Sequence, residues 1–328
     1  MEIASRRIYR FLLRQREPEA CAGPHSDRGN SVSERWFQQR ERGTPLLLQV
    51  ILWIALHMGR PFARMLLYPI TFYFFLTASQ QRHASRLYLR RVLQIEPHAG
   101  QILRHIHCFA ATILDRVYLL SGRHQDFRIE LNNVRVLLDL VNKHQRCLLL
   151  GAHIGSFEVL RALAIAERPF PLKILMYPEH NKTITSLLTK LNPELAGTVI
   201  PLGQVDTVIQ VHECLANGEV VGMLGDRAAN NDKTVDCKIL GGTARFPVGP
   251  AILAASMKVP TILFLGLYLG NKHYEVHFER LPDADFQDRS TRSEEIRQWM
   301  QHYAERLEVR VRHLPYNWFN FYDFWEEA

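Results

Sequence analysis

The sequence predicts an α/β fold in which helices cover both faces of a mostly parallel central sheet. Three short apolar runs, at residues 147–150, 172–177 and 220–224, have the length and composition of strands buried on both faces. Between them, apolar side chains recur at helical spacing, as in residues 157–166 and 207–216. Because parallel strands need long crossover connections, this alternation of strand and helix is typical of a parallel sheet.

Other elements follow from the same two periodicities and from the turn residues between them. Helices are expected at residues 85–93, 101–120, 129–143, 182–191, 251–257 and 290–314, and strands at 198–201, 260–269 and 273–278. The last two strands flank Gly270-Asn271 as a hairpin, and the alternation in residues 274–278 indicates an edge strand with one buried face. Residues 228–240 are polar and are expected to form a mobile loop.

Three regions of the 328 residues differ in composition. Residues 1–44 are polar, rich in arginine and punctuated by proline and glycine. They predict a flexible segment, with a short amphipathic helical stretch at residues 8–13 as the alternative, and no apolar core of a secretory signal is visible. Residues 45–95 predict a membrane-associated helical region that precedes the α/β domain, which is expected to span residues 96–328.

The membrane-associated region combines aliphatic and aromatic runs with arginine. From residue 42 to residue 95 the chain contains seven arginines and neither aspartate nor glutamate. Its two apolar runs, at residues 46–56 and 65–78, are each shorter than the roughly 20 residues with which a helix crosses a bilayer. We expect two helices that lie in the membrane interface, with arginines near anionic lipid. Core helices with a solvated basic face, or one kinked transmembrane anchor, are the alternatives.

The junction between the first buried strand and its helix carries a candidate acid–base pair. His153 follows the strand, where α/β proteins place functional side chains, and Glu158 lies in the first helical turn. A loop histidine can fold back onto a carboxylate in that turn, which would hold the imidazole in one tautomer as a general base. The alternative is structural: His153 is a hydrogen-bonded loop residue, and Glu158 complements the helix dipole.

Several segments, in order, resemble the lysophospholipid acyltransferase superfamily and, within it, the lipid A biosynthesis acyltransferases. The spacing His153-x4-Glu158 after an apolar strand is similar to the H-x4-D/E signature of the superfamily. The other segments that carry the resemblance are residues 225–227, residues 244–254 and the aromatic residues 313–325. The resemblance covers about residues 45–325 and implies the glycerolipid acyltransferase-like α/β fold.

The resemblance implies transfer of a fatty acyl group from an acyl thioester to a hydroxyl of a lipid or glycolipid, such as a lipid A precursor. In that reaction His153 is the general base and Glu158 orients it. The implied donor is acyl carrier protein, with acyl-CoA as the alternative, and a basic protein suits the acidic carrier. The implied location is the cytoplasmic face of a bacterial inner membrane, as a peripheral or singly anchored protein.

Five further residues are candidates for binding substrate. Asp226 and Arg227 follow the third buried strand and are expected to position a headgroup, with an ion pair to each other or to a neighbour as the alternative. Arg245 precedes a proline-containing helix start and is a candidate for contacting phosphate. Family members are thought to use a basic side chain near the end of the second strand; this sequence has no arginine there, and His180 and Lys182 are the candidate substitutes.

The composition argues against other kinds of site. The five cysteines lack C-x-x-C spacing, the fifteen histidines are scattered, and neither H-E-x-x-H nor G-x-G-x-x-G occurs, so no metal and no cofactor are expected. The arginines alternate with aliphatic runs, without a reading motif for nucleic acid, so no nucleic-acid partner is expected. A lipid ester hydrolase that uses the same pair on water, and a non-catalytic lipid-binding protein, are the alternative functions.

Overall fold

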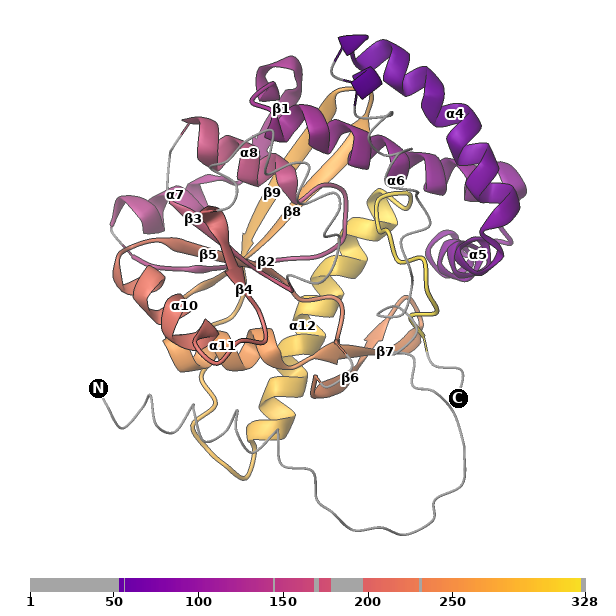
Figure 1. Cartoon of the computed structure of the whole chain (residues 1–328). Helices are drawn as coiled ribbons and strands as arrows, with labels where there is room; N and C mark the ends of the chain where they lie inside the picture. The colour runs from indigo at the N-terminus through magenta and orange to yellow at the C-terminus, as the bar shows by residue number, and fades with distance from the viewer. Residues whose placement is uncertain are drawn as a thin grey trace. The chain divides into compact units, whose positions relative to one another are not determined.

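Seven strands form a mostly parallel central sheet in the order β1-β9-β8-β2-β5-β3-β4 (Figure 1). The structure is a computed structural model that describes residues 53–55, 57–143, 145–167, 171–177, 197–229 and 232–325. The strands are β1 (Arg128–Asn132), β2 (Leu148–Gly151), β3 (Leu172–Met176), β4 (Val199–Pro201), β5 (Val220–Leu224), β8 (Thr261–Gly270) and β9 (His273–Arg280). Neighbouring strands are parallel except β8 and β9, which form an antiparallel hairpin.

Helices connect and flank these strands, and a two-stranded antiparallel sheet lies beside them. The helices are α4 (Arg60–Thr77), α5 (Ser79–Leu93), α6 (Ala99–Leu120), α7 (Arg135–Asn142), α8 (Glu158–Glu167), α10 (Thr207–Ala216), α11 (Gly249–Met257) and α12 (Arg292–His313). A short 3-10 helix spans His124–Asp126. The small sheet consists of β6 (Thr234–Ile239) and β7 (Gly242–Pro247).

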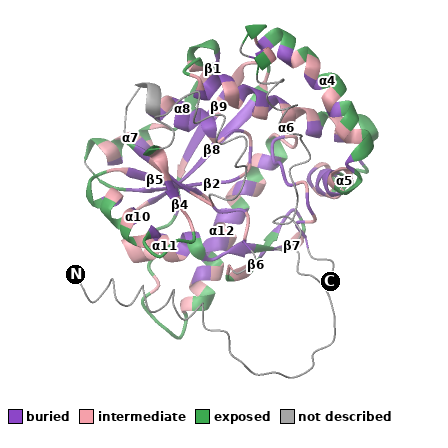
Figure 2. Cartoon of the chain, in the orientation of Figure 1, coloured by how far each residue is buried: buried purple, intermediate pink, exposed green. Residues whose placement is uncertain are grey.

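Apolar side chains of the strands point to both faces of the sheet, so each face needs a covering layer. Leu148 and Leu150 on β2 belong to a hydrophobic cluster with residues of α5, α10, α11 and α12. Leu149, between them, belongs to a second cluster with residues of α6, α7 and α8. The strands are therefore buried on both sides (Figure 2), with β2 as the fourth of the seven strands.

The predicted class, a mostly parallel sheet flanked by helices, is confirmed. The buried strands, the hairpin, and the helices expected at residues 101–120, 207–216, 251–257 and 290–314 lie within a few residues of their predicted bounds. The helix expected at residues 182–191 and the flexible segment 1–44 fall outside the described residues.

Two predictions around β1 are wrong. The helix expected at residues 129–143 is only the shorter α7, because β1 precedes it and Asn133 adopts a φ of 62° that separates the two elements. Asparagine tolerates this left-handed conformation better than most residues do. Since β1 pairs in parallel with β9, the strand expected at the edge of the sheet is an inner strand.

The expectation of a loop at residues 228–240 is also wrong for its second half. Residues 234–239 form β6, which pairs with β7 from Thr234 opposite Pro247 to Ile239 opposite Gly242. The reason is that Cys237 and Ile239 are buried in the core on one side of the strand, although Lys238 between them is exposed and polar. Two buried side chains in a polar segment are too weak a pattern to predict a strand from sequence.

The region that the sequence predicts to associate with a membrane, residues 45–95, is described from residue 53 onward, apart from residue 56. Within the described ranges, no helix by itself combines the length and the apolar character needed to cross a bilayer. The helices α4 and α5 meet those two criteria only when taken together, and a bend of 94° separates them.

Candidate active site

Two side chains that follow neighbouring strands meet at the carboxyl end of the sheet. β2 and β5 are parallel neighbours, and their register places Gly151 opposite Leu224. His153 and Asp226 each lie two residues beyond that last pair, so both residues lie at the carboxyl ends of adjacent strands and are close to each other. The carboxyl edge of a parallel sheet is where open α/β folds hold their ligands.

The carboxylate of Asp226 accepts three hydrogen bonds. The imidazole Nδ1 of His153 lies 2.8 Å from Oδ1, and the backbone N–H of His153 donates to Oδ2 over 3.0 Å. The indole Nε1–H of Trp318 also donates to Oδ2, over 2.9 Å. Asp226 is fully buried, so these donors replace the water that an ionised carboxylate would otherwise need.

The charge state of Asp226 determines the tautomer of His153. Burial raises the pKa of the Asp226 carboxyl, but His153, the charge of Arg227 and the Trp318 hydrogen bond together leave that pKa well below its usual value. An ionised carboxylate only accepts hydrogen bonds, so Nδ1 of the imidazole carries the proton and Nε2 carries the lone pair. The His153 side chain is about one-third exposed, at 32%, which leaves the ring accessible to a substrate.

Glu158, the residue expected to orient His153, has other partners. It begins α8, is buried, and forms ion pairs with Arg116 on α6 and with Arg161 one turn further along α8, the latter at 3.5 Å. The structure therefore corrects the expected pairing: Glu158 neutralises two arginines between α6 and α8, and Asp226 is the carboxylate that holds the imidazole. The H-x4-E spacing alone does not identify the contact.

The backbone of the turn after β2 explains why His153 is directed toward Asp226. Gly155 donates its N–H to the Asn317 carbonyl at 2.8 Å, and Ser156 donates to the Gly266 carbonyl at 2.7 Å. Gly155 has a φ of 66°, and a Cβ at that position would overlap the Gly266 carbonyl. The close approach to β8 therefore requires glycine, and these two hydrogen bonds fix the path of the turn that carries His153.

The C-terminal segment forms the other side of the site. The N–H of Phe319 donates to the carbonyl of His153 at 3.0 Å, and Ile154 and Trp318 form an antiparallel bridge. The carbonyl of Trp318 is 2.9 Å from Nε2 of His105, whose Nδ1 is 2.8 Å from the Ser85 hydroxyl. These contacts show that the aromatic C-terminal segment folds against the domain, and they join helices α5 and α6 to Asp226 through Trp318.

The described residues predicted to bind substrate have contacts within the protein instead. Asp226 is too deeply buried to hold a substrate headgroup, so the role predicted for it is replaced by its contact with His153. Arg227 donates to the Phe319 carbonyl at 2.8 Å and to Asn320 Oδ1 at 3.2 Å, which holds the C-terminal segment. Arg245 is exposed on β7, with its Nε 3.9 Å from a carboxylate oxygen of Asp236.

Two predicted residues, His180 and Lys182, lie outside the described residues. Two contacts of the site were not predicted from the sequence, namely that of Asp226 with the imidazole and that of Trp318 with Asp226. A signal for Asp226 was present, because His153 and Asp226 occupy equivalent positions after buried strands. The sequence contained no comparable signal for Trp318, which is one of several aromatic residues in the tail.

One comparison with known protein families finds a match to this chain. A family described as bacterial lipid A biosynthesis acyltransferase matches residues 15–327, which is nearly the whole chain. No match was found among curated proteins.

Proposed function

Because the chain belongs to the bacterial lipid A biosynthesis acyltransferase family, we propose that it transfers a fatty acyl group from an acyl thioester to a hydroxyl of a lipid or glycolipid. Acyltransfer is the activity of the family, and a lipid acceptor and a thioester donor agree with it. The donor favoured here is acyl carrier protein, an acidic partner for a chain with a formal net charge of +7. The observation that carries the mechanism is the 2.8 Å contact between His153 and Asp226.

In the proposed mechanism, Nε2 of His153 removes the proton from the acceptor hydroxyl as its oxygen attacks the thioester carbonyl. The tetrahedral intermediate collapses, the carbon–sulfur bond breaks, and the imidazolium returns the proton to the leaving thiolate. The products are the oxygen ester and the free thiol, so protons and electrons balance without a co-reactant. Asp226 stays ionised and stabilises the imidazolium, the same role that the buried aspartate has in Ser-His-Asp sites.

The first prediction compares three single substitutions in an acyl-transfer assay. Purified protein in detergent is given labelled acyl carrier protein or acyl-CoA, with a bacterial lipid extract as acceptor. We expect His153→Ala and Asp226→Asn each to lower kcat by about 10²- to 10⁴-fold, because one removes the base and the other disturbs its tautomer. Glu158→Gln is the matched control. It changes a buried carboxylate near His153 in the sequence that makes no contact with the imidazole.

Glu158→Gln should keep the kcat of wild type per folded molecule while lowering the free energy of unfolding by up to about 3 kcal/mol, because two arginines lose their charged partner. Full activity of His153→Ala would exclude the proposed base, and normal activity of Asp226→Asn with a large loss in Glu158→Gln would restore the pairing expected from the sequence. Release of free fatty acid at the same rate with and without acceptor would indicate a hydrolase.

The outer face of α4 has the character of a surface that binds a membrane. Large apolar side chains are exposed along this face, at about half or more of their surface; the set is Phe62, Met65, Tyr68, Phe72, Tyr73 and Leu76. The buried stripe of the same helix contains Arg60 and Thr71, beside Ala63 and Leu67. Exposed positions of α4 are green in Figure 2, and because the large side chains at these positions are apolar, the helix presents an apolar stripe to the outside, the reverse of an ordinary surface helix.

A buried ion pair holds α4 in this orientation. The guanidinium of Arg60 donates to both carboxylate oxygens of Asp115 on α6, at 2.7 and 3.0 Å, and also to the carbonyl of Asn271. Exposed apolar residues in such number mark an interaction surface, and next to a helix rich in arginine they suit an anionic bilayer. We therefore propose peripheral attachment to the cytoplasmic face of the inner membrane through α4.

A further inference from the structure

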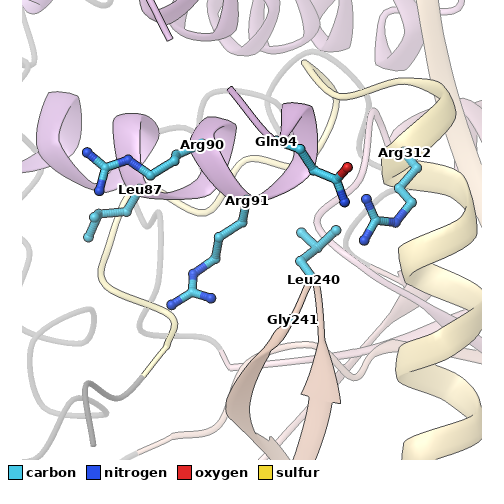
Figure 3. A pocket seen from close by; sticks show the side chains of 7 residues that line it. All are labelled: Leu87, Arg90, Arg91, Gln94, Leu240, Gly241 and Arg312. Atoms are coloured by element: carbon cyan, nitrogen blue, oxygen red, sulfur yellow. The ribbon is translucent and has the colours of Figure 1, made fainter. Parts of the chain in front are cut away.

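A second group of basic side chains lies in a surface pocket between α5, α12 and the tip of the β6–β7 hairpin (Figure 3). The pocket has a volume of about 430 Å³ and is lined by Arg90, Arg91, Gln94, Leu240 and Arg312, among others. No aspartate or glutamate is among the described residues that line it. Neither His153 nor Asp226 belongs to that lining, so this pocket is separate from the site described above.

Arg91 and Arg312 extend from two different helices to either side of Leu240, whereas Arg90 lies beside Leu87 along α5 (Figure 3). In the described part of the chain, Arg91 has no carboxylate partner, and its guanidinium lies over the ring of Trp325 with 4.9 Å to the centroid. An arginine stacked on an aromatic ring keeps its N–H donors available at the edge of the plane. Arg91 is therefore pre-positioned to bind an anion.

The carboxylates near the pocket compete weakly with such an anion. Arg312 pairs with Glu308 at 2.6 Å and Arg90 pairs with Glu96 at 2.6 Å, and all four side chains are partly exposed. Exposed ion pairs of this kind contribute only about 0–1 kcal/mol. A phosphomonoester carries up to about two negative charges and three acceptor oxygens, so it can bind two guanidinium groups at once, which one carboxylate does less well. Arg90 can therefore exchange Glu96 for phosphate at little cost, and Arg312, whose Nε and Nη2 both donate to one oxygen of Glu308, keeps its remaining N–H donors for an anion.

The tip of the hairpin is held rigidly at the floor of this pocket. Leu240 and Gly241 both have positive φ, at 51° and 73°, as a two-residue hairpin turn requires. Leucine is an unusual residue in that conformation, and its side chain is buried while its N–H donates to Glu308 at 2.7 Å. Glu308 thus connects the hairpin tip to Arg312, which keeps the two walls of the pocket together.

We infer that this pocket is a phosphate-binding site in which Arg91 and Arg312 bind the phosphate of a phosphomonoester. The phosphomonoester is either a lipid headgroup or a soluble metabolite, since the chemistry of recognition is the same for both. The pocket is connected to the acid–base pair, because Trp325 packs against Trp318 with ring centroids 6.2 Å apart and Trp318 donates to Asp226. The site does not depend on the proposed acyl transfer.

The test measures binding of the full chain to vesicles of two compositions. Phosphatidylcholine vesicles contain either phosphatidic acid, a phosphomonoester, or phosphatidylglycerol, a phosphodiester, at matched total negative charge. The apolar face of α4 meets both vesicles alike, so the difference reports phosphate recognition. We expect wild type to bind the phosphatidic acid vesicles about tenfold more tightly, in the range of one charge-assisted hydrogen-bond pair. A separate titration with glycerol 3-phosphate measures binding of a soluble phosphomonoester.

Four variants test whether the preference for phosphomonoester comes from this pocket or from the basic surface in general. Arg91→Lys keeps the charge and loses the guanidinium fork, and Arg312→Gln lies on the opposite wall without the contact to Trp325. Both should remove the preference for phosphomonoester, whereas Arg297→Gln, at an exposed and ion-paired arginine elsewhere on α12, should keep it. Arg91→Gln should also lose any binding of glycerol 3-phosphate.

The vesicle experiment and the titration with glycerol 3-phosphate together distinguish a lipid headgroup from a soluble phosphoester as the ligand. Binding of glycerol 3-phosphate that disappears in Arg91→Gln assigns a soluble phosphoester, and a preference seen only with vesicles assigns a lipid headgroup. Equal binding of wild type to both vesicles and no binding of glycerol 3-phosphate would overturn the inference. A preference that survives in both Arg91→Lys and Arg312→Gln would also overturn it. Because the readout is binding, neither result depends on whether the protein transfers acyl groups.

Discussion

The acid–base pair illustrates how a buried carboxylate remains charged. Asp226 loses its hydration on burial, but an imidazole, a backbone N–H and an indole N–H donate to its two oxygens. The consequence is a pKa well below the usual value despite full burial. A carboxylate that is ionised and immobile holds one tautomer of His153, which is the requirement for a general base.

A second histidine, His105, is expected to make stability depend on pH. It is fully buried, and burial lowers its pKa from 6.5 to about 4, although the hydrogen bond to the Trp318 carbonyl opposes this shift. Between those two pH values the unfolded chain binds the proton and the folded chain does not. The free energy of unfolding should therefore rise as the pH increases from about 4 to 6.5, and His105 should contribute roughly 3 kcal/mol to that rise.

The measurement is urea unfolding between pH 4.5 and pH 7 for wild type and His105→Gln. The variant should show a smaller rise in unfolding free energy over this range, because glutamine does not titrate. His83→Gln, a substitution of an exposed histidine on α5, serves as the control and should keep the slope of wild type. Identical slopes for wild type and His105→Gln would show that His105 is not held neutral by burial.

At the scale of elements, the turn after β2 is held from two sides. Gly266 on β8 accepts from Ser156, and Asn317 in the C-terminal segment accepts from Gly155. Asn317 is itself fixed, since its side chain exchanges two hydrogen bonds with the backbone of Tyr268 at 2.7 and 3.0 Å. The position of His153 is therefore set by β8 and by the C-terminal segment as well as by its own strand.

Two glycines with positive φ are predicted to respond differently to alanine. Gly155 and Gly122 have φ values of 66° and 81°, so alanine is strained at both. That conformational strain is about 1–2 kcal/mol for a residue with a Cβ. At Gly155 the Cβ would also meet the backbone of Gly266, whereas nothing lies within 4 Å at Gly122.

Gly155→Ala should therefore lower the free energy of unfolding by about 4 kcal/mol or more and abolish acyl transfer, because the backbone of Gly266 must shift. Gly122→Ala should cost only about 1–2 kcal/mol and leave the transfer rate of folded protein unchanged. Chemical unfolding of both variants and of wild type provides the comparison. Similar losses for the two variants would show that the close approach of the turn to β8 is not what requires glycine at position 155.

At the scale of the molecule, the outward apolar stripe of α4 and the arginine-rich α5 define a membrane-facing side in the proposed function. Removing two aromatic rings from the α4 stripe tests whether this side binds the membrane. Phe62→Ser combined with Phe72→Ser should weaken binding to anionic vesicles by about tenfold or more, since burying each ring in lipid contributes on the order of 1–3 kcal/mol. The temperature of unfolding should change little, because both rings are more than half exposed.

The matched control removes two exposed apolar side chains on other helices, through Ile209→Ser on α10 and Val309→Ser on α12. That double variant should bind vesicles as wild type does, because neither residue lies on the α4 stripe. Co-sedimentation with vesicles measures both. Equal loss of binding in the two double variants would indicate general hydrophobic adsorption, and no loss in either would exclude α4 as the docking helix.

Much of the fold could be predicted because the patterns that specify it are local. Residues 148–150 and 220–224 are continuous apolar runs, and the helices at 207–216 and 292–313 show their period within a few turns. The strands β1 and β6 were missed because the apolar pattern in their own residues is weak. β1 is largely exposed and carries no apolar run, and β6 has two buried side chains among polar ones, so neither differed from its surroundings.

The sequence by itself determined the α/β class, the resemblance to the acyltransferase family and the position of His153 after a buried strand, because all three depend on contiguous residues. Only the tertiary structure decided which acid serves that histidine. Asp226 is 73 residues from His153 and Trp318 is 92 residues from Asp226, so the order of β2 and β5 and the path of the C-terminal segment bring them together. Glu158, although nearer in sequence, is directed to two arginines by the helix that it begins.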